Sequence, residues 1–135
     1  SHFASALKSA ATADLLMIHD SQRPLTGLAQ FERVYAGLTA EIDAVRPVSP
    51  FTETLKSITA DDFIDQTIDR NSMMRISTPE LIRYNAIDFN AKTSTWFIPL
   101  NGSAKTGVVA ADPDSARINS EKEIELMGYL LDWNK

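Results

Sequence analysis

Apolar side chains recur every three or four positions along two stretches of the N-terminal half, a spacing that is typical of amphipathic helices. The first stretch runs over residues 3–19, and the second runs from Thr26, which can cap a helix, to Pro47, where we expect the helix to stop. The apolar face of the second helix consists of Leu28, Phe31, Tyr35, Leu38, Ile42 and Val45. The short polar link between the two stretches predicts an antiparallel helical hairpin.

Two shorter helices are predicted in the middle of the chain. Ser49 and Pro50 provide a cap and a first helical position, after which we expect two turns. Thr59 caps the next helix, in which Asp62 stands at the third position. The inner face of that helix consists of Phe63, Ile64 and Ile68. Residues 78–84 fit either another short helix or the start of a strand.

In the last third of the chain the pattern changes to a two-residue period, which indicates strands. A short strand is expected at 87–89, and residues 93–100 and 106–111 are rich in β-branched and aromatic side chains. Asn101-Gly102 lies between the last two, and this pair is the commonest at a two-residue hairpin turn. We therefore predict an antiparallel β-hairpin at 93–111. Trp96, Ile98, Leu100 and Val109 share one side of this ribbon, and Phe97 and Val108 share the other.

The segment from Ser120 to Trp133 is apolar on nearly every side of a helix, so protein has to enclose it. Ser120 and Glu123 form a capping box, in which the glutamate reaches back to the Ser120 amide. We predict a buried C-terminal helix at 121–133.

The order of these elements predicts an α+β fold. An N-terminal layer of about four helices packs on a small antiparallel sheet that contains the hairpin, and the buried C-terminal helix closes the structure. We expect residues 1–135 to form a single globular domain, with Ser1-His2 resembling the remnant of a cleaved expression tag.

Composition excludes several classes of function. The chain has no cysteine, which excludes disulfides, thiol catalysis and zinc–thiolate sites. Its net charge is −5 and no stripe of lysine and arginine occurs, so we expect no nucleic-acid partner. No segment approaches the ~18 apolar residues of a membrane span, and both an exported and a cytoplasmic location are compatible with the sequence.

Two sets of acidic residues suggest cation binding at first sight. Asp61, Asp65 and Asp69 lie on one face of the predicted helix after Thr59, where a solvated surface explains them better. A second set has the spacing of an EF-hand loop, and it consists of Asp112, Asp114 and Glu123. Ala116 stands where that loop needs an oxygen ligand and Arg117 stands where it needs glycine, so we predict no metal site.

No motif for nucleophilic catalysis or cofactor binding is present. His19 lies at the expected end of the first helix, where a structural role is favoured. The five glycines form neither a phosphate-binding loop nor a dinucleotide fingerprint. We therefore assign no catalytic, cofactor-binding or metal-binding residue.

Four aromatic residues remain as candidates for an interface or a ligand pocket: Trp96, Phe97, Tyr129 and Trp133. Our favoured hypothesis is a non-enzymatic interaction or assembly domain of a larger or exported machine. It binds a protein partner, or another copy of itself, through the hairpin and the C-terminal helix. The alternatives are a small-ligand sensor, with a pocket lined by Trp96 and Tyr129, and a carboxylate-dependent hydrolase.

Overall fold

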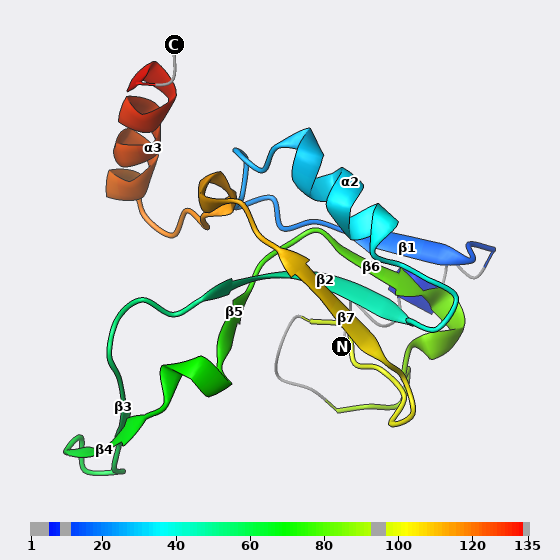
Figure 1. Ribbon diagram of the computed structural model, residues 1–135, viewed down its shortest axis with the longest axis horizontal. Coiled ribbons are helices and arrows are strands. Elements are labelled where there is room, and N and C mark those ends of the chain that lie inside the picture. The colour runs from blue at the N-terminus through cyan, green and yellow to red at the C-terminus, as the bar shows by residue number, and fades with distance from the viewer. Residues whose placement is uncertain (1–5, 9–11, 93–96, 134–135) are drawn as a thin grey trace.

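A mixed β-sheet forms the centre of the molecule (Figure 1). The computed structural model describes residues 6–8, 12–92 and 97–133. In chain order the elements are β1 (Leu15–Ile18), α2 (Leu28–Ala36), β2 (Ala44–Pro50), β3 (Leu55–Ile58), β4 (Ile64–Ile68), β5 (Met74–Ile76), β6 (Glu80–Arg83), β7 (Thr106–Ala110) and α3 (Glu121–Trp133). Short 3-10 helices lie at Arg70–Ser72, Tyr84–Ala86 and Pro113–Ser115.

Strand β2 organises the larger sheet, whose order is β1-β6-β2-β5, with β7 also paired to β2. Strands β6 and β5 both run antiparallel to β2, with Val45 opposite Leu81 and Val48 opposite Ile76. Strand β7 runs parallel to β2 along its other edge. Strands β3 and β4 form a separate two-stranded arm, residues 55–68, that extends away from this sheet (Figure 1).

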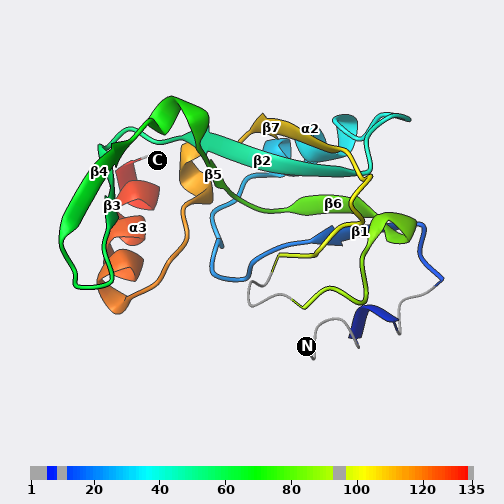
Figure 2. The same cartoon turned by 90° about the horizontal axis from the view of Figure 1, so that it is seen from below.

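Successive side chains of β2 and β6 point to opposite faces of the sheet, so the hydrophobic core has one part on each face. On one face, Val45 and Leu81 pack against Val34 of α2. On the other, Ala44 and Ile82 pack against residues of the segment that follows β6, Ile87 and Ile98. Figure 2 shows α2 on one side of the sheet and this segment on the other.

The predicted N-terminal layer of about four helices is wrong. Leu15–Ile18, assigned to the first helix, forms β1, and the second helix ends at Ala36 instead of continuing to Pro47. Ala44–Pro50 is a central strand with buried residues on both faces. Such a strand shows no polar alternation, so its apolar positions were readily fitted to a helical period.

The two helices predicted between Ser49 and Ile68 are also absent from the structure, which places the β-arm there. Thr59 does cap a backbone turn, since its hydroxyl accepts a hydrogen bond from the Phe63 amide at 3.2 Å. That turn joins two strands, and Asp62 within it has φ 63°, which is left-handed backbone. A threonine cap signals a local hydrogen bond, which serves a hairpin turn as well as a helix. At 80–83 the strand alternative was correct.

The predicted hairpin at 93–111 is wrong in its pairing. Residues 106–110 do form a strand, but its partner is β2 in parallel, with Arg46 opposite Val108. Leu100 makes an isolated bridge with Ile87. Trp96 lies outside the described residues. Asn101-Gly102 still marks a turn, and the chain leaves it toward a strand that is distant in the sequence.

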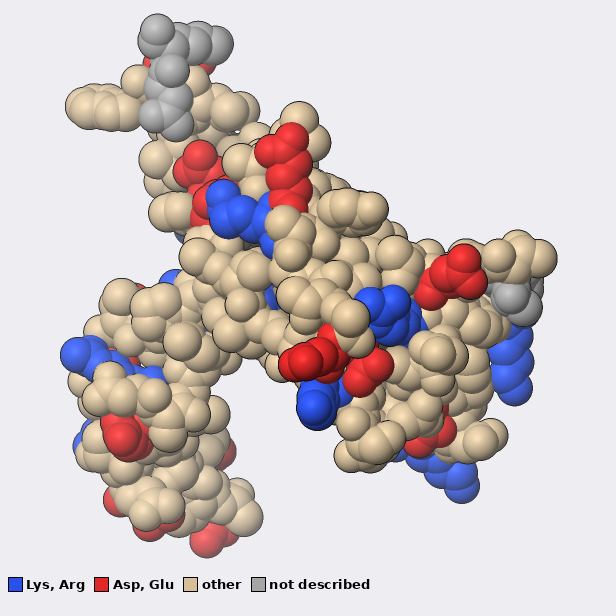
Figure 3. All heavy atoms as spheres, turned by 45° about the vertical axis from the view of Figure 1, so that its right-hand side comes forward, with Lys and Arg blue, Asp and Glu red and all other residues tan. Residues whose placement is uncertain are grey.

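The C-terminal helix is confirmed at 121–133, but the prediction that it is buried is wrong. The Glu123 amide donates to the Ser120 hydroxyl at 3.3 Å, and the Glu123 carboxylate accepts from the Asn119 amide instead of the Ser120 amide. None of the helix residues, all of which the structure describes, is buried. The helix projects from the body (Figure 1), and uncharged side chains make up much of the part of it that is visible in Figure 3. In the described part of the chain, no helix has both the length and the hydropathy to cross a membrane.

Candidate functional site

A cluster of charged residues lies where β1 ends. Asp20 and Arg23 belong to the loop that follows β1, and Arg117 belongs to the segment that precedes α3. The Asp20 carboxylate lies 2.9 Å from Nε of Arg117 and 3.7 Å from Nε of Arg23. One carboxylate therefore holds two guanidinium groups close together, although Asp20 and Arg117 are far apart in the sequence.

Arg23 is the most unusual member of this cluster, because its side chain is only 13% exposed. One terminal nitrogen donates to the Ser115 carbonyl oxygen at 2.6 Å. Its Nε has no hydrogen-bond partner among the described residues. Burial lowers the pKa of this guanidinium from its ordinary value, Asp20 opposes that effect and Arg117 adds to it. The charge of Arg23 is therefore held beside Asp20 within the protein, where both side chains are largely buried.

Arg117 ties the segment before α3 to the loop after β1. Its terminal nitrogens donate to the side-chain oxygens of Gln22 and Asn119. The Ile118 amide donates to the Gln22 carbonyl at 2.8 Å, and the Gln22 side-chain amide donates back to the Ile118 carbonyl at 3.1 Å. These paired hydrogen bonds fix the position of Arg117 relative to Asp20.

His19 and Thr78 support the same loop. The Thr78 hydroxyl accepts from the Asp20 amide and lies 3.1 Å from Nδ1 of His19. Nε2 of His19 lies 3.2 Å from the Arg23 carbonyl oxygen, and its ring packs on Phe31. The structure therefore places His19 after a strand and not at the end of a helix, as the sequence pattern predicted.

A hollow of about 350 Å³, here called the arginine groove, opens beside Arg23. It is lined by Arg23, Ser49, Pro50, Thr52, Arg75, Ser77, Ala111, Asp112, Pro113, Ser115 and Ala116. Its lining includes two arginines and four hydroxyl-bearing residues, around a space large enough for a phosphate-bearing small molecule. Its carboxylate, Asp112, is already paired with Arg33. The groove therefore favours an anionic ligand.

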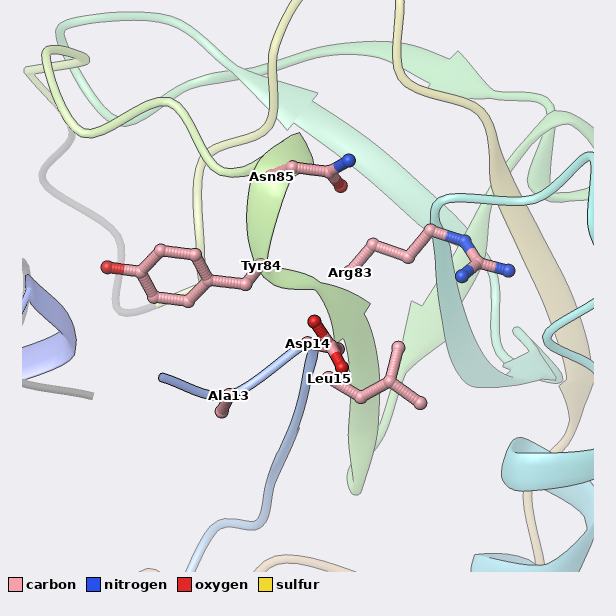
Figure 4. A pocket seen from close by; sticks show the side chains of 6 residues that line it. All are labelled: Ala13, Asp14, Leu15, Arg83, Tyr84 and Asn85. Atoms are coloured by element: carbon pink, nitrogen blue, oxygen red, sulfur yellow. The ribbon is translucent and has the colours of Figure 1, made fainter. Parts of the chain in front are cut away.

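A second hollow lies at the opposite end of β1 (Figure 4). Arg83, its arginine, donates to the carbonyl oxygens of Ile42 and Thr39 at 3.1 and 3.0 Å. Asp14 adds a carboxylate to the lining. Because the Arg83 guanidinium is already hydrogen-bonded within the protein, this hollow is less suited to bind an anion than the arginine groove is.

The aromatic residues proposed from the sequence lie outside the arginine groove. Tyr129 and Trp133 are 74% and 88% exposed on α3. Phe97 lies with its ring centroid 5.4 Å from the guanidinium of Arg46. Trp96 lies outside the described residues. Among the residues that the structure describes, no group of three or more histidine, aspartate or glutamate side chains is arranged to hold a metal ion.

Sequence reasoning missed Asp20, Arg23 and Arg117 as site residues. One local signal was available, because polar residues follow the short apolar run at 15–18. That run fits a strand, and loops at strand ends commonly carry binding residues. Nothing local indicates that Arg117 completes the cluster.

Comparison with known proteins identifies relatives of this chain. Residues 2–96 match the family described as "IspD: 2-C-methyl-D-erythritol 4-phosphate cytidylyltransferase". The 2-C-methyl-D-erythritol 4-phosphate cytidylyltransferase of Nocardia farcinica is 30% identical over 132 residues, a match covering 93% of this chain and 57% of the relative. The corresponding protein of Rhodococcus jostii is 28% identical, with 89% and 56% covered. The chain thus spans little more than half the length of these relatives.

Solved structures show the same fold. The 4-diphosphocytidyl-2C-methyl-D-erythritol synthase of Anaerococcus prevotii superimposes with a TM-score of 0.76 at 22% identity, covering 97% of this chain and 63% of that one. The 2-C-methyl-D-erythritol 4-phosphate cytidylyltransferase of Thermus thermophilus gives 0.73 at 17% identity, covering 98% and 70%. A mixed sheet with few helices thus replaces the predicted helical layer.

These matches also correct the predicted function. The relatives are named as enzymes of one transferase family. The non-enzymatic interaction or assembly domain was therefore the wrong hypothesis, and so were the small-ligand sensor and the carboxylate-dependent hydrolase. Those hypotheses were based on the absence of familiar catalytic motifs, and such an absence does not exclude an enzyme.

Proposed function

Because the chain belongs to the IspD family of 2-C-methyl-D-erythritol 4-phosphate cytidylyltransferases, we propose that it forms the phosphate-binding part of such an enzyme. Its substrate in this proposal is a 2-C-methyl-D-erythritol 4-phosphate, which receives a cytidylyl group. The observation that carries the proposal is the arginine groove, which Arg23 and Arg75 line and whose one carboxylate, Asp112, is already paired with Arg33.

The proposed reaction joins two phosphates. An oxygen of the acceptor phosphate forms a bond to the phosphorus of the cytidylyl donor, and the bond from that phosphorus to the leaving group breaks. The leaving group keeps the electron pair, and the product contains a diphosphate. Such transfers depend on orienting the reactants and on stabilising negative charge on the phosphate oxygens.

The described residues supply both requirements. Arg23 and Arg75 bring positive charge to the groove, and Ser49 and Ser77 line it with hydroxyls. The Asp20 carboxylate pairs with Nε of Arg117 at 2.9 Å and with Nε of Arg23 at 3.7 Å. In this proposal Arg23 binds a phosphate oxygen, and Asp20 holds the two guanidinium groups in place.

A transfer assay tests this function directly. The chain is incubated with cytidine triphosphate and 2-C-methyl-D-erythritol 4-phosphate, and ³¹P NMR follows the appearance of a diphosphate linkage. We expect the chain to bind the phosphorylated acceptor and not the acceptor that lacks phosphate, and we expect product only with the phosphorylated acceptor. Calorimetry measures acceptor binding separately. Absence of both turnover and phosphate-dependent binding would contradict the proposal.

We also propose that α3 binds a second copy of the chain. This proposal is supported by the exposed apolar side chains of Leu126, Tyr129, Leu130 and Trp133. Fusion to another enzyme occurs among the relatives, since the Rhodospirillum rubrum protein, 40% identical over 74 residues, is named a bifunctional enzyme IspD/IspF.

A chain that ends at Ser120 should lose this association and still fold. Because no residue of α3 is buried, its removal should change the thermal unfolding midpoint by less than ~2 °C. Light scattering after size exclusion measures the mass of both forms. The same number of chains per particle in both forms would rule out association through α3. A much lower unfolding midpoint in the shortened form would show that α3 belongs to the core.

A further inference from the structure

A buried glutamine of α2 connects the two segments that line the arginine groove. Gln30 is fully buried. Its Nε2 donates to the Thr78 carbonyl oxygen at 2.7 Å, and its Oε1 accepts from the Asp112 amide at 2.5 Å. A side-chain amide has one donor end and one acceptor end, so Gln30 satisfies both backbone groups at once. The segment before β6 and the segment after β7 are thereby held at a fixed separation.

The first of these connections leads to Asp20. The hydroxyl of Thr78, whose carbonyl oxygen Gln30 binds, accepts from the Asp20 backbone amide at 3.1 Å. The Asp20 carboxylate in turn pairs with Arg117. A shift of Thr78 therefore moves the residue that orients the cluster.

The second connection leads to Arg23. The Asp112 carbonyl oxygen accepts from both the amide and the hydroxyl of Ser115, at 3.0 and 2.7 Å. The Ser115 carbonyl oxygen accepts from Arg23 at 2.6 Å. Arg33, one turn along α2 from Gln30, adds an ion pair with Asp112. The guanidinium of Arg23 is thus placed through the same glutamine.

We infer that Gln30 is a positioning residue that holds the Thr78 segment, which binds Asp20, and the Asp112–Ser115 segment, which binds Arg23, at a fixed separation. What the two charged groups bind rests on the proposed function, whereas the positioning itself rests on the hydrogen bonds above. A leucine at this position has a similar volume and suits the apolar side of α2. It leaves the Thr78 carbonyl and the Asp112 amide without their partner.

Amide hydrogen exchange measured by NMR tests this role in the wild type, in Gln30→Leu and in the control Val34→Ala. Val34 is fully buried on the same helix and packs on Val45 and Leu81, so its truncation lowers stability without touching the connections. We expect the amides of Asp20 and Ser115 to exchange at least about tenfold faster in Gln30→Leu than in Val34→Ala. Equal exchange in both variants would overturn the inference.

Gln30→Glu provides a second test that a role in packing alone would not satisfy. A protonated carboxyl group can donate to Thr78 and accept from Asp112, whereas an ionised one cannot donate. We expect protection of the Asp20 amide to approach the wild-type value in acid and to fall as the pH rises. The ionisable side chains on the connected segments are Asp112, Arg33 and His19, which lies 3.1 Å from the Thr78 hydroxyl. Val34→Ala keeps all three, so measuring it at each pH supplies the reference for their effect and for intrinsic exchange. A protection ratio independent of pH would overturn the inference.

Ligand binding separates this inference from the proposed function. With 2-C-methyl-D-erythritol 4-phosphate as the probe, we expect about tenfold weaker binding in Gln30→Leu and little change in Val34→Ala. If the wild type binds no such ligand, the proposed function fails, and the exchange data still decide whether Gln30 positions the two segments.

Discussion

Replacing Arg23 with methionine should weaken binding of the phosphorylated acceptor by about 10- to 100-fold, since a hydrogen bond to a charged group contributes ~1.5–3 kcal/mol. Arg23 lines the arginine groove and is nearly buried, with its Nε 3.7 Å from the Asp20 carboxylate and a terminal nitrogen bonded to the Ser115 carbonyl oxygen. Methionine keeps much of the aliphatic volume and removes every donor. Isothermal titration with 2-C-methyl-D-erythritol 4-phosphate measures the loss.

Arg75→Met is the matched control for this experiment. Arg75 lines the same groove, but it is exposed and its guanidinium lies 5.9 Å from the centroid of the Phe51 ring. An exposed cation contributes less, so we expect a loss of less than about fivefold. Equal losses in the two variants would show that net charge, and not the placement of Arg23, determines binding. Unchanged binding in Arg23→Met would remove the basis for the phosphate site.

Replacing Arg46 with methionine should lower the free energy of unfolding by ~3–5 kcal/mol above neutral pH, because it leaves a buried carboxylate unpaired. Nε of Arg46 lies 2.9 Å from Oε2 of Glu80, whose side chain is fully buried. The other carboxylate oxygen, Oε1, has no hydrogen-bond partner among the described residues. Arg46 also donates to the Ile98 carbonyl, so part of the loss comes from that bond.

The loss should depend on pH in a definite direction. Burial raises the pKa of Glu80 above its ordinary value of 4.5, whereas Arg46, through its charge and its hydrogen bond, and the Ile98 backbone oppose this rise. Between the unfolded-state and folded-state pKa values, the folded protein therefore holds a proton that the unfolded chain releases. The resulting contribution to stability is complete below pH 4.5. It is lost as the pH rises through the folded-state pKa. Without Arg46 that pKa rises further, so Arg46→Met should be closest to the wild type in acid.

Urea unfolding at several values from about pH 5 to about pH 8 measures this dependence. The double variant Arg46→Met with Glu80→Gln provides the control, because an amide cannot ionise. We expect the double variant to be more stable than Arg46→Met at the upper end of this range and to show a flatter pH profile. A loss of the same size at every pH would contradict a buried carboxylate as the cause.

The part of the fold that the sequence predicted is the part with local causes. Helix α3 lies at its predicted bounds because its capping residues and apolar period act within a few residues of one another. Residues 106–110 form the expected strand for the same reason, since β-branched side chains favour extended backbone. Thr59 caps a turn, as its residue type suggests, although that turn belongs to a hairpin.

Burial and pairing were mispredicted because they depend on distant segments. The apolar side chains of α3 indicate that contact with protein would stabilise the helix. They do not indicate which protein surface provides that contact. In the same way Asn101-Gly102 favours a turn, but it does not require the strand at 106–110 to pair with its sequence neighbour. Strand β7 instead pairs in parallel with β2, which lies more than fifty residues earlier in the chain.

The amino-acid sequence by itself determined the types of chemistry present and the conformation of segments whose hydrogen bonds are local. Only the tertiary structure decided that β2 forms the centre of a sheet, and that Asp20 meets Arg117 while Gln30 meets Asp112. The physical reason is that each of these contacts closes a loop of many residues. The entropy lost in closing it is recovered only when the whole sheet assembles, so no short window of sequence records the result.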